Sequence, residues 1–330
     1  MRKVLIIPIL VLAVLVSLPW ACSSNSPAAP APVTVVILGT PTPTGVEGQD
    51  WFFTTLTAGF SARRYQSSVA FNNKMWVIAG LDTTLKNDAY YSTDGITWTL
   101  TTAAALFSPR KWQTALSYNN KVWVIGGYDG AQKNDVYYSA EGATWFAATG
   151  GAAFSARSGH TSLVYNNKMW VIGGSDPALK NDVYYSTDGV TWTLATASAG
   201  FSPRAFHTSV VFNNKMWVIG GTDNVTPYLN DVWSSTDGVT WTQATASAAF
   251  SARFFHSSLT YDNKMWVMAG SNGSSLGDVY YSSDGATWTQ ATASAPFGAR
   301  SSQSSVVFNN QMWVINGLSV SNKNDVWESP

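Results

Sequence analysis

Cysteine is almost absent from this chain of 330 residues, in which Cys22 is the only one. Without a cysteine pair, the fold gains no covalent cross-link. Charge is also scarce, because only 12% of the residues are charged and 19 basic residues balance 19 acidic ones. No basic stripe exists, so we expect no nucleic-acid partner. Stability must come from aromatic packing, since the chain holds 16 tryptophans, 14 tyrosines and 15 phenylalanines.

Long apolar runs are missing as well, apart from one at the N-terminus. Residues 4–18 are apolar and follow Arg2 and Lys3. The run is shorter than the about 20 residues that a transmembrane helix needs, and a basic start before a short apolar core is typical of a secretory signal. We therefore predict a signal peptide over residues 1–21 and a location outside the cytoplasm, secreted or at a bacterial cell envelope.

Cys22 stands where such a signal ends. Residues 18–22, Leu-Pro-Trp-Ala-Cys, resemble a bacterial lipoprotein processing site, although Pro19 and Trp20 replace the usual small or aliphatic residues. The resemblance implies a lipid anchor on Cys22 that holds the protein at the membrane. Plain secretion is the alternative, with Cys22 an incidental residue. Residues 22–50 are predicted to be a linker, because five prolines lie there among Ala, Ser and Thr.

The rest of the chain is a sixfold repeat. A tryptophan recurs in steps of 47, 47, 47, 49 and 47 residues, at Trp76, Trp123, Trp170, Trp217, Trp266 and Trp313. An arginine keeps the same steps, at Arg63, Arg110, Arg157, Arg204, Arg253 and Arg300. Six copies at this period indicate a repeat architecture, so we assign residues 51–330 to one folded unit.

Each copy contains four short segments rich in strand-forming residues, which in the third copy are 160–165, 169–172, 183–186 and 190–194. Asn166-Asn167 and Thr187-Asp188-Gly189 are predicted to be tight turns between them. One four-stranded antiparallel sheet cannot hide both faces from water, whereas six sheets packed radially can. We therefore predict an all-β, six-bladed β-propeller; an open solenoid would need polar end caps, which we do not find.

The ends of the repeat region predict how the ring closes. The last copy stops after its third strand, at Asn324 to Glu328. Trp51 lies 47 residues before Trp98, the fourth-strand tryptophan of the first copy. The segment that begins at Trp51 should therefore supply the fourth strand of the last blade.

The copies resemble the kelch repeat, which is also found in the central domain of galactose oxidase. The matching features of the third copy are Arg157, the polar His160, the pair Gly173-Gly174, the aromatic third strand Tyr184-Tyr185 and Trp192. The resemblance covers about 280 residues, although three blades have Ala79-Gly80, Ala269-Gly270 or Asn316-Gly317 in place of the glycine pair. The turn in Ser92 to Trp98 also resembles the Asp-box of sialidases, in which it is structural.

Most candidate catalytic residues belong to the repeat. Fourteen of the 16 aspartates fall into three repeated series, and only Asp50 and Asp262 stand outside them. Short polar side chains at turns commonly bond to nearby backbone. A glycosidase needs two carboxylates in distinct environments, and no such pair stands out. We expect no catalytic residue; a sialidase-like or other carbohydrate-active enzyme is the alternative.

The histidines and the repeated arginines have structural explanations too. His160, His207 and His256 share one repeat position, where three imidazoles at equivalent places could converge on a metal. Gln66, Gln113 and Gln303 fill this position in the other blades, which favours a shared hydrogen-bonding role, so we expect no metal and no cofactor. The arginines should pair with the repeated aspartates rather than form a positive ring like the arginine cluster of sialidases.

Variation between blades marks the candidate binding site. The two residues after each repeated arginine differ strongly, and so do the loops after the glycine pair, the longest of which is 222–229. The kelch resemblance implies that these connections share one face, which usually binds the partner. The candidate ligand-binding residues are Arg64, Tyr65, Lys111, Trp112, Tyr128, Phe206, Tyr228, Phe254 and Phe255.

Aromatic and basic side chains at a concave mouth suit a protein or a glycan ligand. The alternative is that these rings pack between blades. We predict a monomeric, non-catalytic protein- or carbohydrate-binding module, and a purely structural surface protein is the third possibility.

Overall fold

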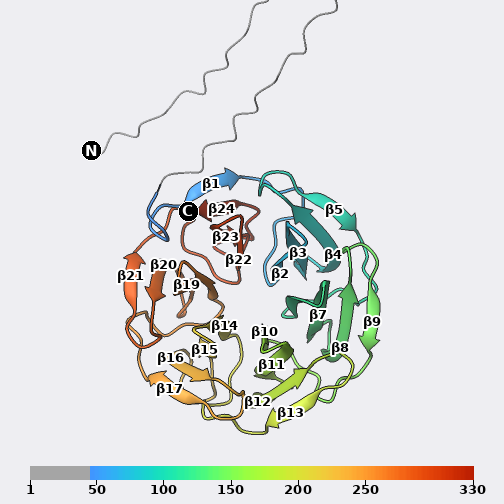
Figure 1. Cartoon of the computed structure of the whole chain (residues 1–330). Coiled ribbons are helices and arrows are strands. Elements are labelled where there is room, and N and C mark those ends of the chain that lie inside the picture. Colours follow the sequence, from blue (N-terminus) through green and yellow to red (C-terminus); the bar gives the residue numbers. More distant parts are fainter. Residues whose placement is uncertain (1–44) are drawn as a thin grey trace, which may run out of the picture. The chain divides into compact units, whose positions relative to one another are not determined.

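The structure is a computed structural model, and it describes residues 45–330. The predicted signal peptide, Cys22 and most of the predicted linker lie outside the described residues. Within residues 45–330 the chain forms 24 strands in six four-stranded antiparallel sheets. The sheets surround a central axis as the blades of a propeller (Figure 1), which confirms the predicted fold. No helix in this part of the chain has the length and apolar character needed to cross a membrane.

Each blade runs from a first strand near the axis to a fourth strand at the rim (Figure 1). The first strands of blades 1 to 6 are β2 (Ser67–Phe71), β6 (Thr114–Tyr118), β10 (Thr161–Tyr165), β14 (Thr208–Phe212), β18 (Ser257–Tyr261) and β22 (Ser304–Phe308). The second strands are β3 (Lys74–Leu81), β7 (Lys121–Tyr128), β11 (Lys168–Ser175), β15 (Lys215–Gly221), β19 (Lys264–Ser271) and β23 (Gln311–Ile315). The third strands are β4 (Leu85–Ser92), β8 (Gln132–Ser139), β12 (Leu179–Ser186), β16 (Leu229–Ser235), β20 (Ser275–Ser282) and β24 (Val326–Ser329). The fourth strands are β5 (Thr99–Thr102), β9 (Phe146–Thr149), β13 (Thr193–Thr196), β17 (Thr242–Thr245), β21 (Thr289–Thr292) and, for blade 6, β1 (Phe52–Thr55).

Two asparagines make the hairpin between the first and second strands. In blade 3, Asn166 and Asn167 have φ angles of 48° and 55°. Asparagine tolerates this left-handed region better than most residues, and two such residues in a row form the turn whose twist matches the flanking strands. The predicted tight turn is confirmed.

The second and third strands are longer than predicted. In blade 3, a bulge at Gly173, with a φ angle of 59°, lets the ladder continue, and Gly174 then pairs with Lys180. The added residues are largely polar, so a pattern of hydrophobic residues does not reveal them. The fourth strand begins later than predicted, at Thr193, because the Asp188 carboxylate first accepts the N–H groups of the two residues after Gly189.

The chain ends close the ring as predicted. Strand β1 pairs antiparallel with β24, with Phe52 opposite Glu328 and Phe53 opposite Trp327. Trp51, before the strand, is 4% exposed and packs edge-on against Phe297, in the connection between β21 and β22, with ring centroids 5.0 Å apart. The first segment of the ring thus completes its last blade.

The turn before β1 is built from both ends of the propeller. In blade 1, the N–H of Gly95 donates to Ser92 Oγ, and Trp98 Nε1 donates to the Gly95 carbonyl. In blade 6, the N–H of Gly48 donates to Ser329 Oγ over 2.9 Å, and Trp51 Nε1 donates to the Gly48 carbonyl over 3.1 Å. Residues 45–50, which the sequence analysis assigned to the linker, therefore form part of the turn between the third and fourth strands of blade 6.

The hydrophobic cores lie between neighbouring blades. Trp123 of blade 2, for example, packs with Met169, Val171 and Trp192 of blade 3. A Cβ atom at position 189 would lie 2.1 Å from the Trp123 ring, so the close approach of the next blade requires glycine there. These contacts make the ring one packed unit and fix the positions of the residues at its centre.

Candidate binding site at one mouth of the channel

The residues that vary between blades gather at one mouth of the central channel. The residue after each repeated arginine forms a bridge with the residue after the glycine pair, as Lys111 does with Tyr128 and Phe254 with Ser271. The two sets of variable connections therefore share one face, as the resemblance implied. The next residue of each blade lines a cavity of about 130 Å³; these are Tyr65, Trp112, Gly159, Phe206, Phe255 and Ser302.

Four of these six residues are bulky aromatics in a strained backbone conformation. Tyr65, Trp112, Phe206 and Phe255 have φ angles of 61°, 58°, 56° and 53°. This region is rare for large side chains and costs about 1 kcal/mol or more for each residue. Gly159, with a φ angle of 64°, has the same conformation in blade 3. The backbone conformation at this position therefore suits glycine, yet four of the six blades have an aromatic residue there.

Backbone hydrogen bonds between blades hold this conformation. The N–H of Phe206 donates to the Gly159 carbonyl over 2.8 Å, and the N–H of Ser302 donates to the Phe255 carbonyl over 2.8 Å. Equivalent bonds of 3.2 Å join blades 2 and 3, blades 4 and 5, and blades 6 and 1. The bonds run around the opening of the channel and fix the positions of the side chains there.

The four aromatic rings contact one another across the channel, and we call them the aromatic mouth. The centroid distances are 5.2 Å for Tyr65–Trp112, 5.4 Å for Trp112–Phe206, 4.4 Å for Phe206–Phe255 and 5.2 Å for Tyr65–Phe255. The rings on either side of blades 3 and 6 meet because these two blades have small residues at the position; a Cβ atom on Gly159 would lie 2.6 Å from the Phe206 ring. All four residues remain partly exposed.

Three further aromatic candidates extend the aromatic mouth outward. Tyr128 lies 5.9 Å from Trp112, and Phe254 lies 4.5 Å from Phe255, measured between ring centroids. Tyr228, from the long loop, stacks on Phe254 with centroids 5.3 Å apart and an angle of 18° between the rings. The aromatic surface therefore continues from the axis to the variable loops of blades 2 and 4.

The two basic candidates lie over this surface. Lys111 Nζ is 3.9 Å from the centroid of Trp112, and Arg64 Cζ is 5.2 Å from that of Tyr65. Burial lowers the pKa of Lys111, and the positive charge of Arg64 lowers it further. All nine candidate residues thus belong to one continuous cluster.

Arg64 and Lys111 make no ion pair with any residue from 45 to 330. Among the described residues, the Arg64 side chain donates only to the Asn322 side chain, over 3.2 Å. Nearby acids are already paired, Asp82 with Lys86 at 2.9 Å and Asp129 with Lys133 at 2.8 Å. Two uncompensated positive charges therefore lie side by side on blades 1 and 2.

Beneath the aromatic mouth, the Gln/His position links neighbouring blades. His160 Nε2 lies 3.2 Å from Thr114 Oγ1 of the preceding blade, and Gln113 Nε2 donates to Ser67 Oγ over 3.3 Å. Each of the other four blade junctions has the same contact. The predicted hydrogen-bonding role is confirmed.

The histidines are buried and neutral. Burial, helped by the charge of Arg157, lowers the pKa of His160 to about 3. Burial and Arg253 lower the pKa of His256 in the same way, also to about 3. Across residues 45–330 no group of three or more His, Cys, Asp or Glu side chains is placed to hold a metal ion.

Each repeated arginine is buried in a two-bond pair with an aspartate. In blade 3, Arg157 Nη1 and Nη2 lie 2.5 Å and 2.9 Å from the Asp182 oxygens, and Nη1 also donates to the Gly173 carbonyl. All six blades contain this pair. The predicted pairing is confirmed, so this series forms no positive ring at the mouth.

The acids outside these pairs also have structural partners. Asp94 accepts the N–H groups of Ile96 and Thr97 within its turn. Asp50 accepts the N–H of Val46, and Asp262 pairs with Lys264 at 3.0 Å. Neither cavity on the channel axis is lined by an acid among the described residues.

Sequence reasoning missed one set of functional partners, the hydroxyl that bonds to each Gln or His. These residues are Ser67, Thr114, Thr161, Thr208, Ser257 and Ser304. A signal was present, because the fourth position after the arginine is Ser or Thr in every copy. Serine and threonine are common in strands and turns alike, so the pattern has no meaning until the first strands are known to face one another.

Comparison with known proteins agrees with this geometry. Residues 112–317, more than half of the chain, match the family model described as the KLHDC2/KLHL20/DRC7 Kelch-repeats domain. None of the curated proteins matches the chain. The chain therefore belongs to the kelch-repeat propellers.

Proposed function

We propose that this propeller is a non-catalytic binding module that holds a protein partner at the aromatic mouth. The observation that carries the proposal is the strain at Tyr65, Trp112, Phe206 and Phe255, four bulky side chains in a backbone conformation that suits glycine. Strain of this kind is typically concentrated at functional sites. Packing alone does not require these rings, because Gly159 and Ser302 occupy the same position in blades 3 and 6.

The chemistry of the surface indicates the character of the partner. Partly exposed aromatic rings provide large, rigid contact area, which is where binding energy concentrates in protein interfaces. Arg64 and Lys111 make no ion pair among the described residues, so an acidic side chain of the partner could pair with them. We therefore propose a partner segment that places an apolar side chain on the rings and a carboxylate over blades 1 and 2.

A peptide selection tests this proposal. The purified protein would be used to select from a random library of acetylated, amidated hexapeptides, whose blocked ends carry no charge. We expect enrichment of acidic peptides with an apolar residue, and at least tenfold weaker binding of the selected peptides to the Trp112→Gly variant. Arg64→Met with Lys111→Met should weaken acidic peptides selectively and remove the dependence of affinity on salt.

The same protein on a glycan array and in a sialidase and glycosidase panel distinguishes the alternatives. Binding to a glycan that Trp112→Gly abolishes would make the mouth a carbohydrate site. Turnover of any substrate would overturn the non-catalytic assignment.

We also propose that the module acts outside the cytoplasm, tethered through a lipid on Cys22. The support is the sequence of residues 1–22, a short apolar run after two basic residues followed by the only cysteine. In a bacterial host, the wild-type protein should fractionate with membranes and the Cys22→Ala variant should not. A wild-type protein that is soluble and begins beyond Cys22 would show plain secretion instead.

A further inference from the structure

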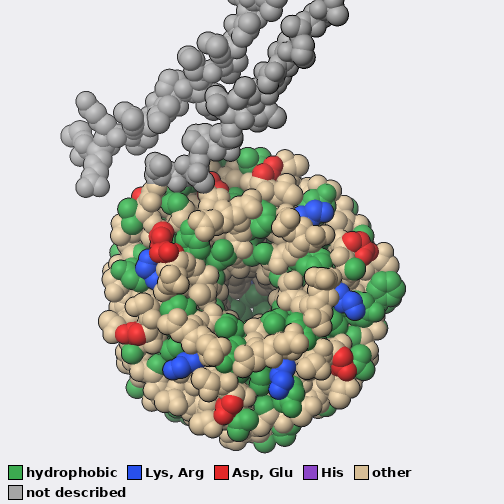
Figure 2. Space-filling view, in the orientation of Figure 1, with side chains coloured by type: hydrophobic (Ala, Val, Ile, Leu, Met, Phe, Trp, Pro, Cys, Tyr) green, Lys and Arg blue, Asp and Glu red, His purple; other side chains and the backbone are tan. Residues whose placement is uncertain are grey.

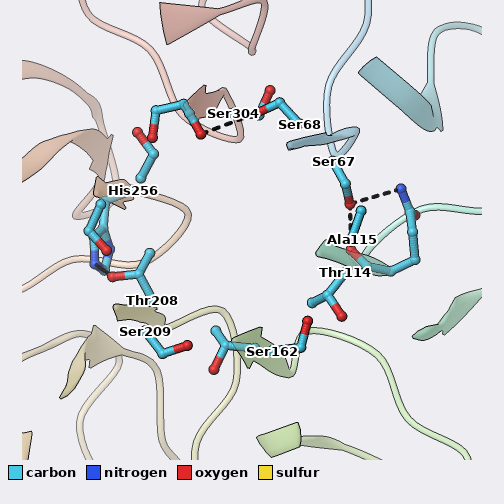
Figure 3. Close-up of a pocket in the computed structure, with 14 residues that line it drawn as sticks. Ser67, Ser68, Thr114, Ala115, Ser162, Thr208, Ser209, His256 and Ser304 are labelled. Atoms are coloured by element: carbon cyan, nitrogen blue, oxygen red, sulfur yellow. Dashed lines mark hydrogen bonds between the residues drawn. The ribbon is translucent and has the colours of Figure 1, made fainter. Parts of the chain in front are cut away.

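The channel behind the aromatic mouth is a second candidate site. It forms a cavity of about 240 Å³ lined mainly by residues of the first strands, with at least one from each blade. Serine and threonine predominate around it, and Figure 3 shows Ser67, Ser68, Thr114, Ser162, Thr208, Ser209 and Ser304 around an open centre. On the face seen in Figure 2 the centre of the ring is hollowed, with hydrophobic side chains at the bottom of the hollow.

The wall contains hydroxyl groups that the fold itself does not use. One hydroxyl of each blade bonds to the Gln or His of the next blade, as described above. The following position is different: Ser162, Ser209 and Ser258 have buried Oγ atoms without a hydrogen-bond partner in the described chain. All three line the cavity, on the adjacent blades 3, 4 and 5. Buried hydroxyls usually have a hydrogen-bond partner. A molecule in the channel that offers donors and acceptors would supply the missing hydrogen bonds.

The wall excludes charged ligands. No Asp, Glu, Lys or Arg lines the cavity. Its one titratable side chain is His256, which burial keeps neutral because its pKa lies at about 3. An ion would therefore lose its hydration without gaining a counter-charge, whereas a neutral ligand with hydroxyl groups would exchange water bonds for bonds to the wall.

The size of the space and its closed end limit the ligand further. The volume lies below the about 300–1,000 Å³ of sites for drug-sized molecules. The cavity adjoins the smaller one under the aromatic mouth, with which it shares Gln113 and His256. The four rings thus close one end of the channel, so a ligand would enter from the opposite face.

We propose that the channel binds a small, neutral molecule with several hydroxyl groups, of the size of one sugar ring or a hexitol. Such a ligand fits the volume, offers both donors and acceptors to the serine wall, and carries no charge to desolvate. The proposal is independent of the partner at the aromatic mouth, because it uses a different set of side chains.

Calorimetric titration of the purified full-length protein tests it. The panel would contain myo-inositol, glucitol, glucose and galactose, with gluconate and glucosamine as charged molecules of matched size. We expect at least one neutral compound to bind and both charged ones to fail. Ser209→Ala should weaken binding about 3- to 10-fold, the effect of one lost neutral hydrogen bond, and Ser209→Leu, which fills the channel, should abolish it.

Two controls make the outcome decisive. Ser294→Leu adds the same side chain at an exposed position and should bind like the wild type, as should Arg64→Met at the mouth. Circular dichroism would confirm that each variant folds, and Ser209→Ala keeps the test valid if Ser209→Leu does not. Absence of binding by every neutral compound, unchanged binding in Ser209→Leu, or a crystal soaked with the panel that holds only water in the channel would overturn the proposal.

Discussion

Arg63 and Arg64 are neighbours in the sequence but belong to two different parts of the molecule. Arg63 is 1% exposed and forms a two-bond pair with Asp88, a pair that every blade repeats. Arg64 lies over Tyr65 at the mouth, forms no ion pair with the described residues, and is replaced by Lys, Ser, Ala, Phe and Ser in the other blades. Near-identical copies therefore distinguish the scaffold from the candidate site. The arginine of the scaffold repeats in every blade, whereas the residue directly after it differs between blades.

Opening the ring should have the largest effect on the stability of the scaffold. Deleting residues 51–57 removes β1 together with the buried Trp51, whose loss alone costs about 3–5 kcal/mol. The melting temperature should fall by about 10 °C or more. Ser329→Ala removes only the hydroxyl that accepts the Gly48 N–H and should cost about 1 kcal/mol. An unchanged melting curve in the deletion would show that β1 does not close the ring.

Two matched substitutions test whether a scaffold arginine and Arg64 differ in their contribution to stability. Arg157→Ala leaves Asp182 in a largely buried place without its partner, so the free energy of unfolding should fall by about 3 kcal/mol or more. Arg64→Ala removes a cation over a partly exposed ring and should cost less than about 1 kcal/mol. Urea unfolding measures both. Equal losses in the two variants would contradict the division into scaffold and mouth.

The buried histidines predict a dependence of stability on pH. Their pKa is about 3 in the folded ring for His160 and His256, against about 6.5 in the unfolded chain. The unfolded state therefore takes up protons first, so stability should be complete above about pH 6.5 and should fall as the pH drops toward 3.

Replacing His160, His207 and His256 together by glutamine sharpens this test, because glutamine occupies the position in the other blades. The triple variant should lose little stability at pH 7.5 and should lose much less than the wild type between pH 6.5 and 4.5, measured by urea unfolding. Parallel curves for the two proteins would mean that other groups cause the acid sensitivity.

The smallest expected effect on stability belongs to the mouth. Trp112→Gly loses contacts of a partly exposed ring but relieves a left-handed conformation that costs about 1–2 kcal/mol. The net change in the free energy of unfolding should stay below about 1 kcal/mol, while peptide binding falls at least tenfold. A loss of several kcal/mol would instead assign Trp112 to the scaffold.

Much of this molecule could be predicted from the sequence, because a repeat reports the same physical constraint six times. The period and the strand-forming segments fix a ring of four-stranded blades, and Trp51 in register with Trp98 fixes its closure. The interchange of His and Gln at one position identifies a hydrogen-bonding role. Local propensity and spacing suffice for these conclusions, since each follows from comparing equivalent positions in the copies.

Other features were decided only when the blades came together. The bulge at Gly173 extends the strands through polar residues, which no hydrophobic pattern marks. The turn shared by Gly48 and Ser329 joins the two ends of the propeller, 281 residues apart. The contact between Tyr65 and Phe255 spans blades 1 and 5, and it exists because blade 6 has a serine between them.

The sequence by itself therefore determined the fold, the scaffold pairs and the residues that vary. The tertiary structure alone decided that the variable residues form one aromatic cluster with two uncompensated cations, and that the serines behind it surround a neutral channel. The physical reason is distance along the chain: strand pairing and turns follow from neighbouring residues, whereas a mouth and a channel depend on side chains that only the closed ring brings to a common axis.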